Sequence, residues 1–142
     1  MPMPLRQIAI LLLTLLLSTP DAARAAAANG QGYYTKSQAD DGQAVFHQQC
    51  AICHGDRLQG GAGPALAGDQ FLSVSQYQQI TAEYFYDFMS THMPLTHPGS
   101  LTKTQYIDIM AYLLEANGYA SGPHQLTARD EELKGIKIEP QK

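Results

Sequence analysis

The sequence predicts a small all-α domain with long loops and an extended C-terminal tail. Three segments between residues 38 and 117 carry helical spacing of apolar residues or helix-capping signals, and a glycine-rich stretch at 55–68 separates the first from the second. The last part of the chain, 121–142, is mostly polar. With 142 residues, 44 % of them hydrophobic and 15 % charged, the chain has the composition of a folded globular protein.

The first residues have the features of a secretory signal peptide. Arg6 precedes an apolar run at 8–17, and Ala23-Arg24-Ala25 is a small-x-small cleavage site. An uncleaved membrane anchor is the alternative, but a helix of that run spans about 15 Å, roughly half of a hydrocarbon core. We therefore expect 1–25 to be removed on export to the periplasm, and 26–36 to form a linker.

The acidic balance of the chain argues against one class of partner. The formal net charge is −4, and removal of 1–25, which carries two arginines and one aspartate, makes it one unit more negative. Nucleic acids attract basic protein surfaces. We therefore expect no nucleic-acid partner, and no stable membrane insertion once the leader is removed.

The first helix is expected at 38–49. Ser37 is a candidate N-cap, and Asp40 and Asp41 would lie in the first turn, where the helix dipole favours negative charge. The inward face of this helix is expected to carry Gly42, Val45 and Phe46.

A loop is expected at 55–68 because this segment is rich in glycine. Gly60-Gly61-Ala62-Gly63 resembles a phosphate-binding loop, but no Gly-Lys-Ser/Thr ending follows and no strand precedes it, so we reject that interpretation.

A second helix is expected at 82–90, with Phe85, Phe88 and Met89 on one face. Pro94 disfavours helical backbone at Met93, which places Met93 in a loop.

The last helix of the domain has the clearest boundaries. Thr102 and Gln105 form a capping box at its start, and Asn117-Gly118 is a stop signal at its end. Apolar residues between these signals repeat at i, i+3, i+4 and i+7, namely Tyr106, Ile109, Met110 and Leu113.

The C-terminal extension, 121–142, is expected to hold a short turn at 130–133 and an extended segment where Ile136 and Ile138 alternate with polar residues. Our hypothesis is that it wraps the domain or docks on a partner through its apolar residues. The alternative is a loosely attached end. The candidate contacts are Leu126, Leu133, Ile136 and Ile138.

The two cysteines of the chain, Cys50 and Cys53, are followed directly by His54. Cys-x-x-Cys-His is the attachment sequence for c-type haem. Two thiols one helical turn apart can each bond one vinyl group of the same porphyrin, and the adjacent imidazole is then carried to the iron. The motif predicts one haem c, covalently attached through Cys50 and Cys53, with His54 as a metal ligand.

Three other interpretations of the cysteines explain the sequence less well. A thioredoxin-like dithiol would be expected within a βαβ pattern, which is not seen. A structural disulfide is possible in an oxidising compartment but gives no reason for His54. A zinc site would need two further ligands at a suitable spacing.

Residues 37–120 resemble a class I, mono-haem c-type cytochrome, similar to those that serve periplasmic quinoprotein-type dehydrogenases. The matching features are Gly42, Phe46, the 50–55 segment, the 63–66 segment, Met93-Pro94 and the 111–114 segment. The resemblance implies a fold of three to five helices around one haem, in which Gly42 and Phe46 cross Tyr112. It also implies that the Pro64 carbonyl accepts the hydrogen bond from the second ring nitrogen of His54.

Met93 is the candidate for the sixth iron ligand. It precedes Pro94 in a loop that can arch over the porphyrin, and a thioether ligand favours reduced iron. Met89 is the nearest rival, although its helical position suits a packing role, as does that of Met110. His92 or His97 could instead give a bis-histidine haem of lower potential.

Filled axial positions predict an electron-transfer protein without catalytic residues: a carrier, or the electron-accepting subunit of a dehydrogenase. The expected partners are a periplasmic dehydrogenase as donor and an oxidase or another cytochrome as acceptor. We expect the exposed haem edge near 51–52, Ala62 and 94–95. The alternative is a haem protein with an open sixth site that acts on peroxide or senses a gas.

Overall fold

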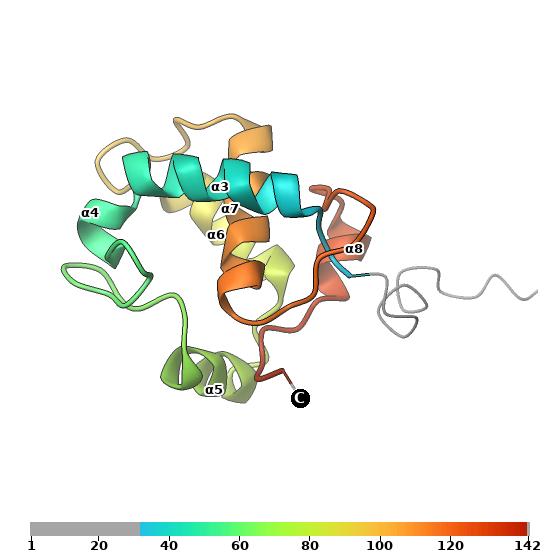
Figure 1. Ribbon diagram of the computed structural model, residues 1–142. Coiled ribbons are helices and arrows are strands. Elements are labelled where there is room, and N and C mark those ends of the chain that lie inside the picture. The colour runs from blue at the N-terminus through green and yellow to red at the C-terminus, as the bar shows by residue number, and fades with distance from the viewer. Residues whose placement is uncertain (1–31, 142) are drawn as a thin grey trace, which may run out of the picture.

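The computed structural model describes residues 32–141, which contain six helices and no strand. The predicted signal peptide and the start of the predicted linker lie outside these residues. Figure 1 shows the helices gathered around α7, with the extension after it passing α6 and α5. The helices are α3 (Lys36–Gln49), α4 (Ala51–His54), α5 (Asp69–Tyr77), α6 (Ala82–His92), α7 (Lys103–Ala116) and α8 (Asp130–Lys134).

The first and last helices of the domain, α3 and α7, cross in close contact (Figure 1). Gly42 permits this approach, because a Cβ at that position would lie 1.9 Å from the backbone oxygen of Asp108. The rings of Phe46 and Tyr112 meet beside the crossing, with centroids 5.5 Å apart. The predicted crossing is therefore present.

Helix α3 begins earlier than the sequence predicted. Its N-cap is Thr35, whose hydroxyl accepts from the Gln38 amide at 3.2 Å, so Ser37 lies inside the first turn. Thr35 has extended backbone and Ser37 is helical, and only the former geometry lets a side chain cap the free amides. At α7 the expected capping box between Thr102 and Gln105 is present.

Helix α5 was not predicted. Only two of its residues, Leu72 and Ser75, are buried. A helix with so small a buried face has only a weak apolar pattern in its sequence. Helix α6 starts at Ala82 as expected and continues to His92, with Thr81 as N-cap and Met93 as C-cap. The turn predicted at 130–133 is the short helix α8.

The extension after α7 packs on the domain, contrary to a loosely attached end. All four of its candidate contact residues are buried, namely Leu126, Leu133, Ile136 and Ile138. Backbone bonds join it to the loop before α6, where Thr81 and Lys137 form an antiparallel bridge. Within residues 32–141, no helix combines the length and the apolar character needed to cross a membrane.

Candidate functional site: an apolar cavity beside the Cys-x-x-Cys-His segment

A large cavity lies between the segment that follows α3 and the helices α5, α6 and α7. Its volume is about 800 Å³, within the range of about 300–1,000 Å³ that is typical of cofactor sites. Its lining is mainly aliphatic and aromatic. The lining residues that concern the predicted site are Cys50, Cys53, His54, Gly63, Pro64, Met89 and Met93.

The first side of the cavity, here called the motif wall, is formed by Cys50, Cys53, His54, Gly63 and Pro64. Cys50 ends α3, and the single turn of α4 then carries Cys53 and His54. The α4 turn is closed by backbone bonds from the amides of Cys53 and His54 to the Cys50 carbonyl, at 3.1 and 3.0 Å. This geometry places both thiols and the imidazole on one short piece of chain.

Burial raises the pKa of the Cys50 thiol to about 11, and the neighbouring Cys53 adds to this rise. Neither cysteine is in a disulfide, and both are partly buried. A raised pKa is the opposite of what activates a redox dithiol, in which the thiolate is stabilised. The thioredoxin-like interpretation therefore has no support in this environment.

The ring of His54 is held in place by the loop that follows it. His54 is 9 % exposed, and its Nδ1 lies 2.8 Å from the Pro64 carbonyl oxygen. A carbonyl can only accept, so Nδ1 donates, and in a neutral ring Nε2 then carries the lone pair. This is the arrangement in which a second ring nitrogen orients a metal-binding histidine.

Gly63 lies flat against the same ring. A Cβ at this position would come within 2.8 Å of His54 Cε1 and 3.0 Å of Nδ1. The loop is tied to the motif by the Gly63 amide, which donates to the Cys53 carbonyl at 2.8 Å. Within the glycine-rich stretch, Gly63 thus allows close backbone packing on His54.

The second side of the cavity, here called the α6 wall, consists of Phe85, Phe88 and Met89 of α6 together with Met93. The Met93 amide donates to the Met89 carbonyl at 3.0 Å, and the Met93 carbonyl accepts from the Tyr106 hydroxyl at 2.6 Å. Met93 is therefore tied both to its own helix and to α7. Met89 also lines the cavity, although it is buried like a core residue.

The other candidate ligands lie elsewhere. His92 and His97 are exposed and are not among the described residues that line the cavity. The His92 ring stacks on Phe88, with centroids 4.7 Å apart. Met110 is 1 % exposed and packs in the core. Within the described part of the chain, no three or more His, Cys, Asp or Glu residues cluster as a metal site, which leaves the zinc interpretation unsupported.

Sequence reasoning missed the contribution of α5. Phe71 and Val74 from this helix line the cavity, as does Ile80 from the loop after it. Phe71 packs edge-on against Phe85, with ring centroids 5.4 Å apart. A sequence signal for α5 does exist: Val74 and Ser75 follow Phe71 by three and four residues, which is one helical turn, and this segment begins just after the loop glycine Gly68.

A helical domain around one large apolar cavity, with a Cys-x-x-Cys-His segment in its wall, defines a class I-like c-type cytochrome. The comparisons with known proteins agree with this class of protein. Residues 37–113 match the family described as "Cytochrome C oxidase, cbb3-type, subunit III". This match spans more than half of the chain, which therefore belongs to that family.

Two further relatives are similar to parts of the chain. Cytochrome c-552 of Schinkia azotoformans is 55 % identical over 29 residues, which cover 20 % of this chain and 55 % of that protein. The crystal structure of the sulfane dehydrogenase SoxCD from Paracoccus pantotrophus contains a chain that superposes on this one with a TM-score of 0.52. The alignment covers 88 % of this chain and 68 % of that one at 22 % identity, which shows a shared fold. The family match and the cytochrome relative support haem-based electron transfer for this domain.

Proposed function

We propose that the protein carries one covalently attached haem c and transfers single electrons, either as a carrier or as the electron-accepting subunit of a dehydrogenase. In this proposal Cys50 and Cys53 hold the porphyrin, and His54 and Met93 bind the iron. The observation that carries it is the buried His54, whose Nδ1 is engaged by Pro64 at 2.8 Å beside a cavity of about 800 Å³. The second ring nitrogen is thereby left available.

The described residues fit this group. The donor set of two thiols, one imidazole and one thioether is the set found in methionine-ligated c-type haem. The apolar lining suits a porphyrin face, and the lack of a side chain at Gly63 lets the loop pack on the His54 ring without a clash. When bound, haem supplies a metal that changes oxidation state by one electron.

The residues of the chain have three tasks in this mechanism. Pro64 fixes the orientation and the basicity of the His54 ring, and Tyr106 fixes the backbone of Met93. The aromatic and aliphatic lining excludes water, which adjusts the reduction potential. Rigid holding of His54 and Met93 would keep their positions nearly unchanged between the two oxidation states of a bound haem, which would lower the barrier to electron transfer.

Exposed apolar side chains support an electron-transfer edge at the cavity mouth. Ile52 is 91 % exposed and Leu95 is 76 % exposed, and both line the cavity. A small apolar rim suits the weak and brief encounters of redox partners. We propose a periplasmic dehydrogenase as donor and an oxidase or another cytochrome as acceptor, in line with the sulfane dehydrogenase and oxidase-subunit relatives.

A periplasmic location is part of the proposal. It is supported by the predicted signal peptide at 1–25. Fractionation of cells that produce the full chain, followed by intact mass of the mature protein, tests both points. A cytoplasmic protein with its leader intact would contradict the location.

The haem test is an absorption spectrum combined with intact mass. We expect one added haem and a low-spin, methionine-ligated spectrum. Met93→Ala should retain the haem and bind imidazole or carbon monoxide at an open site, whereas the matched variant Met89→Ala should keep the wild-type spectrum. A wild-type protein that binds these ligands as readily as Met93→Ala would instead favour the peroxidase or gas-sensor function.

A further inference from the structure

We propose that the extended segment 136–139, which follows α8 and is here called the strap, is a positioning element for the Met93 ligand. It acts through α6, the helix that begins beside the strap and ends at Met93. The inference rests on the proposed function, because it takes Met93 as the iron ligand.

The strap is bonded to the backbone on both sides of the α6 N-cap. The Ala82 amide donates to the Ile136 carbonyl at 2.8 Å, and the Ile138 amide donates to the Ile80 carbonyl at 2.9 Å. These bonds bracket Thr81, whose hydroxyl caps the helix. The strap therefore fixes the point at which α6 starts.

The other edge of the strap is bonded to Tyr119, three residues after the end of α7. The Tyr119 hydroxyl donates to the Lys137 carbonyl at 2.5 Å and accepts from the Glu139 amide at 2.9 Å. The strap thus lies between the start of α6 and the end of α7. Lys134 of α8 adds an ion pair to Glu83 in the first turn of α6, at 3.2 Å.

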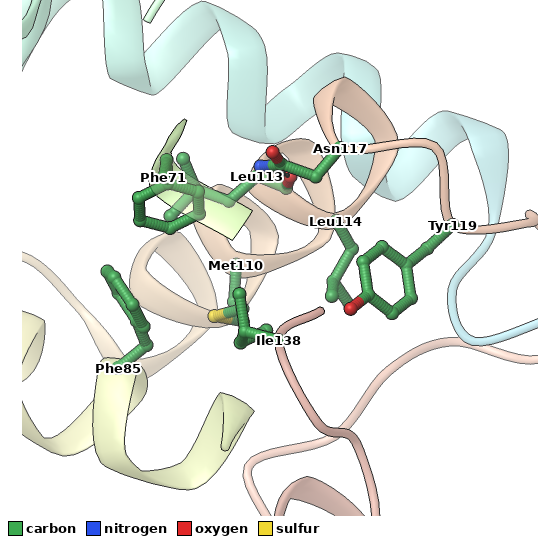
Figure 2. A pocket seen from close by; sticks show the side chains of 8 residues that line it. All are labelled: Phe71, Phe85, Met110, Leu113, Leu114, Asn117, Tyr119 and Ile138. Atoms are coloured by element: carbon green, nitrogen blue, oxygen red, sulfur yellow. Dashed lines mark hydrogen bonds between the residues drawn. The ribbon is translucent and has the colours of Figure 1, made fainter. Parts of the chain in front are cut away.

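Side chains of the strap also support the cavity lining from behind. Figure 2 shows Ile138 with Phe71, Phe85 and Leu113 around one small space of about 10 Å³. These three partners also line the large cavity. Ile136 and Ile138 are 4 % and 3 % exposed, so the strap closes the core on the far side of the residues that face the cofactor site.

Helix α6 is consequently held at both ends. Its C-terminal end is fixed by the Tyr106 hydroxyl on the Met93 carbonyl, and its N-terminal end is fixed by the strap. A helix transmits a tilt at one end to the other as a rigid element. Loosening the strap should therefore weaken the bond between Met93 and the iron without removing any residue that lines the cavity.

The strength of the bond between Met93 and the iron can be tested by competition with an external ligand. Imidazole binding to the oxidised holoprotein is titrated in wild type, Met93→Ala, Ile138→Ala and Leu126→Ala. Leu126 is the matched control, because it lies in the same extension and is 2 % exposed but is bonded to Gln38 of α3. We expect imidazole affinity to rise by about tenfold in Ile138→Ala, which corresponds to about 1.4 kcal/mol, and to change little in Leu126→Ala.

The outcomes separate the two proposals. Equal imidazole affinity in wild type and Met93→Ala would overturn the ligand assignment. Much tighter binding in Met93→Ala, together with equal values for Ile138→Ala and Leu126→Ala, would overturn the strap alone. If Ile138→Ala does not accumulate with haem, Ile138→Val and Leu126→Val give the same comparison at smaller amplitude, with the increase again expected only for Ile138.

Discussion

The two walls of the cavity are built in different ways. In the motif wall, the bonds that position His54 join residues close in sequence: Pro64 is ten positions away from His54. In the α6 wall, Met93 is bonded to Tyr106 on α7, and α6 starts against Ile136 and Ile138 near the end of the chain. The comparison teaches that one proposed ligand, His54, is held by local structure and the other, Met93, by the assembled fold.

The largest expected effect is on the motif wall. His54→Ala should abolish the low-spin haem spectrum, because no other described imidazole lines the cavity. Haem content and the absorption spectrum are the measurements, and His97→Ala, at an exposed position, is the control. A low-spin spectrum that survives in His54→Ala and disappears in His97→Ala would reverse the assignment.

A smaller effect is expected where the loop packs on His54. Gly63→Ala adds a Cβ 2.8 Å from the ring and should cost about 1–3 kcal/mol of unfolding free energy through overpacking. The iron environment should change with it, because the His54 ring must shift. Denaturant melts and the absorption spectrum measure both. Gly135→Ala is the matched control, since its Cβ would meet nothing closer than 3.4 Å.

On the α6 wall, Tyr106→Phe removes the hydroxyl that donates to the Met93 carbonyl at 2.6 Å. We expect a loss of about 0.5–1.5 kcal/mol of stability and easier displacement of Met93 by imidazole. The 90 % exposed Tyr77 provides the control variant Tyr77→Phe. Identical imidazole titrations of Tyr106→Phe and wild type would show that this bond does not hold the ligand.

The smallest expected effect concerns how the stability that Tyr119 contributes through the strap depends on pH. Burial raises the pKa of Tyr119, whose hydroxyl bonds the strap. The unfolded chain therefore loses this proton at lower pH than the folded protein, so the contribution of Tyr119 to stability falls as pH rises above the ordinary tyrosine pKa of about 10.

Thermal melts of wild type and Tyr119→Phe between neutral and alkaline pH measure the contribution of Tyr119 to stability. The variant should be less stable at neutral pH, because two hydrogen bonds to the strap are lost. It should also lose less stability than wild type as the pH is raised. Parallel curves would exclude a contribution from Tyr119.

The helix boundaries show how far local signals reach. The capping box at Thr102 and the end of α6 before Pro94 were predicted, because caps and proline act within a few residues. Helix α5 was missed because its burial is slight and depends on what packs on it. Leu58 is another such case: it lies in the predicted loop, yet it is 1 % exposed and has a φ of 61°.

The sequence by itself determined the class of the protein and the motif wall. Cys50, Cys53 and His54 lie within one turn, and Pro64 follows in the same short loop, so local backbone bonds suffice to bring them together. Only the tertiary structure decided how α6 and the C-terminal extension are arranged. Ile138 and Ile80 are far apart along the chain, and their contact exists because burial of the strap outweighs the entropy lost in ordering it.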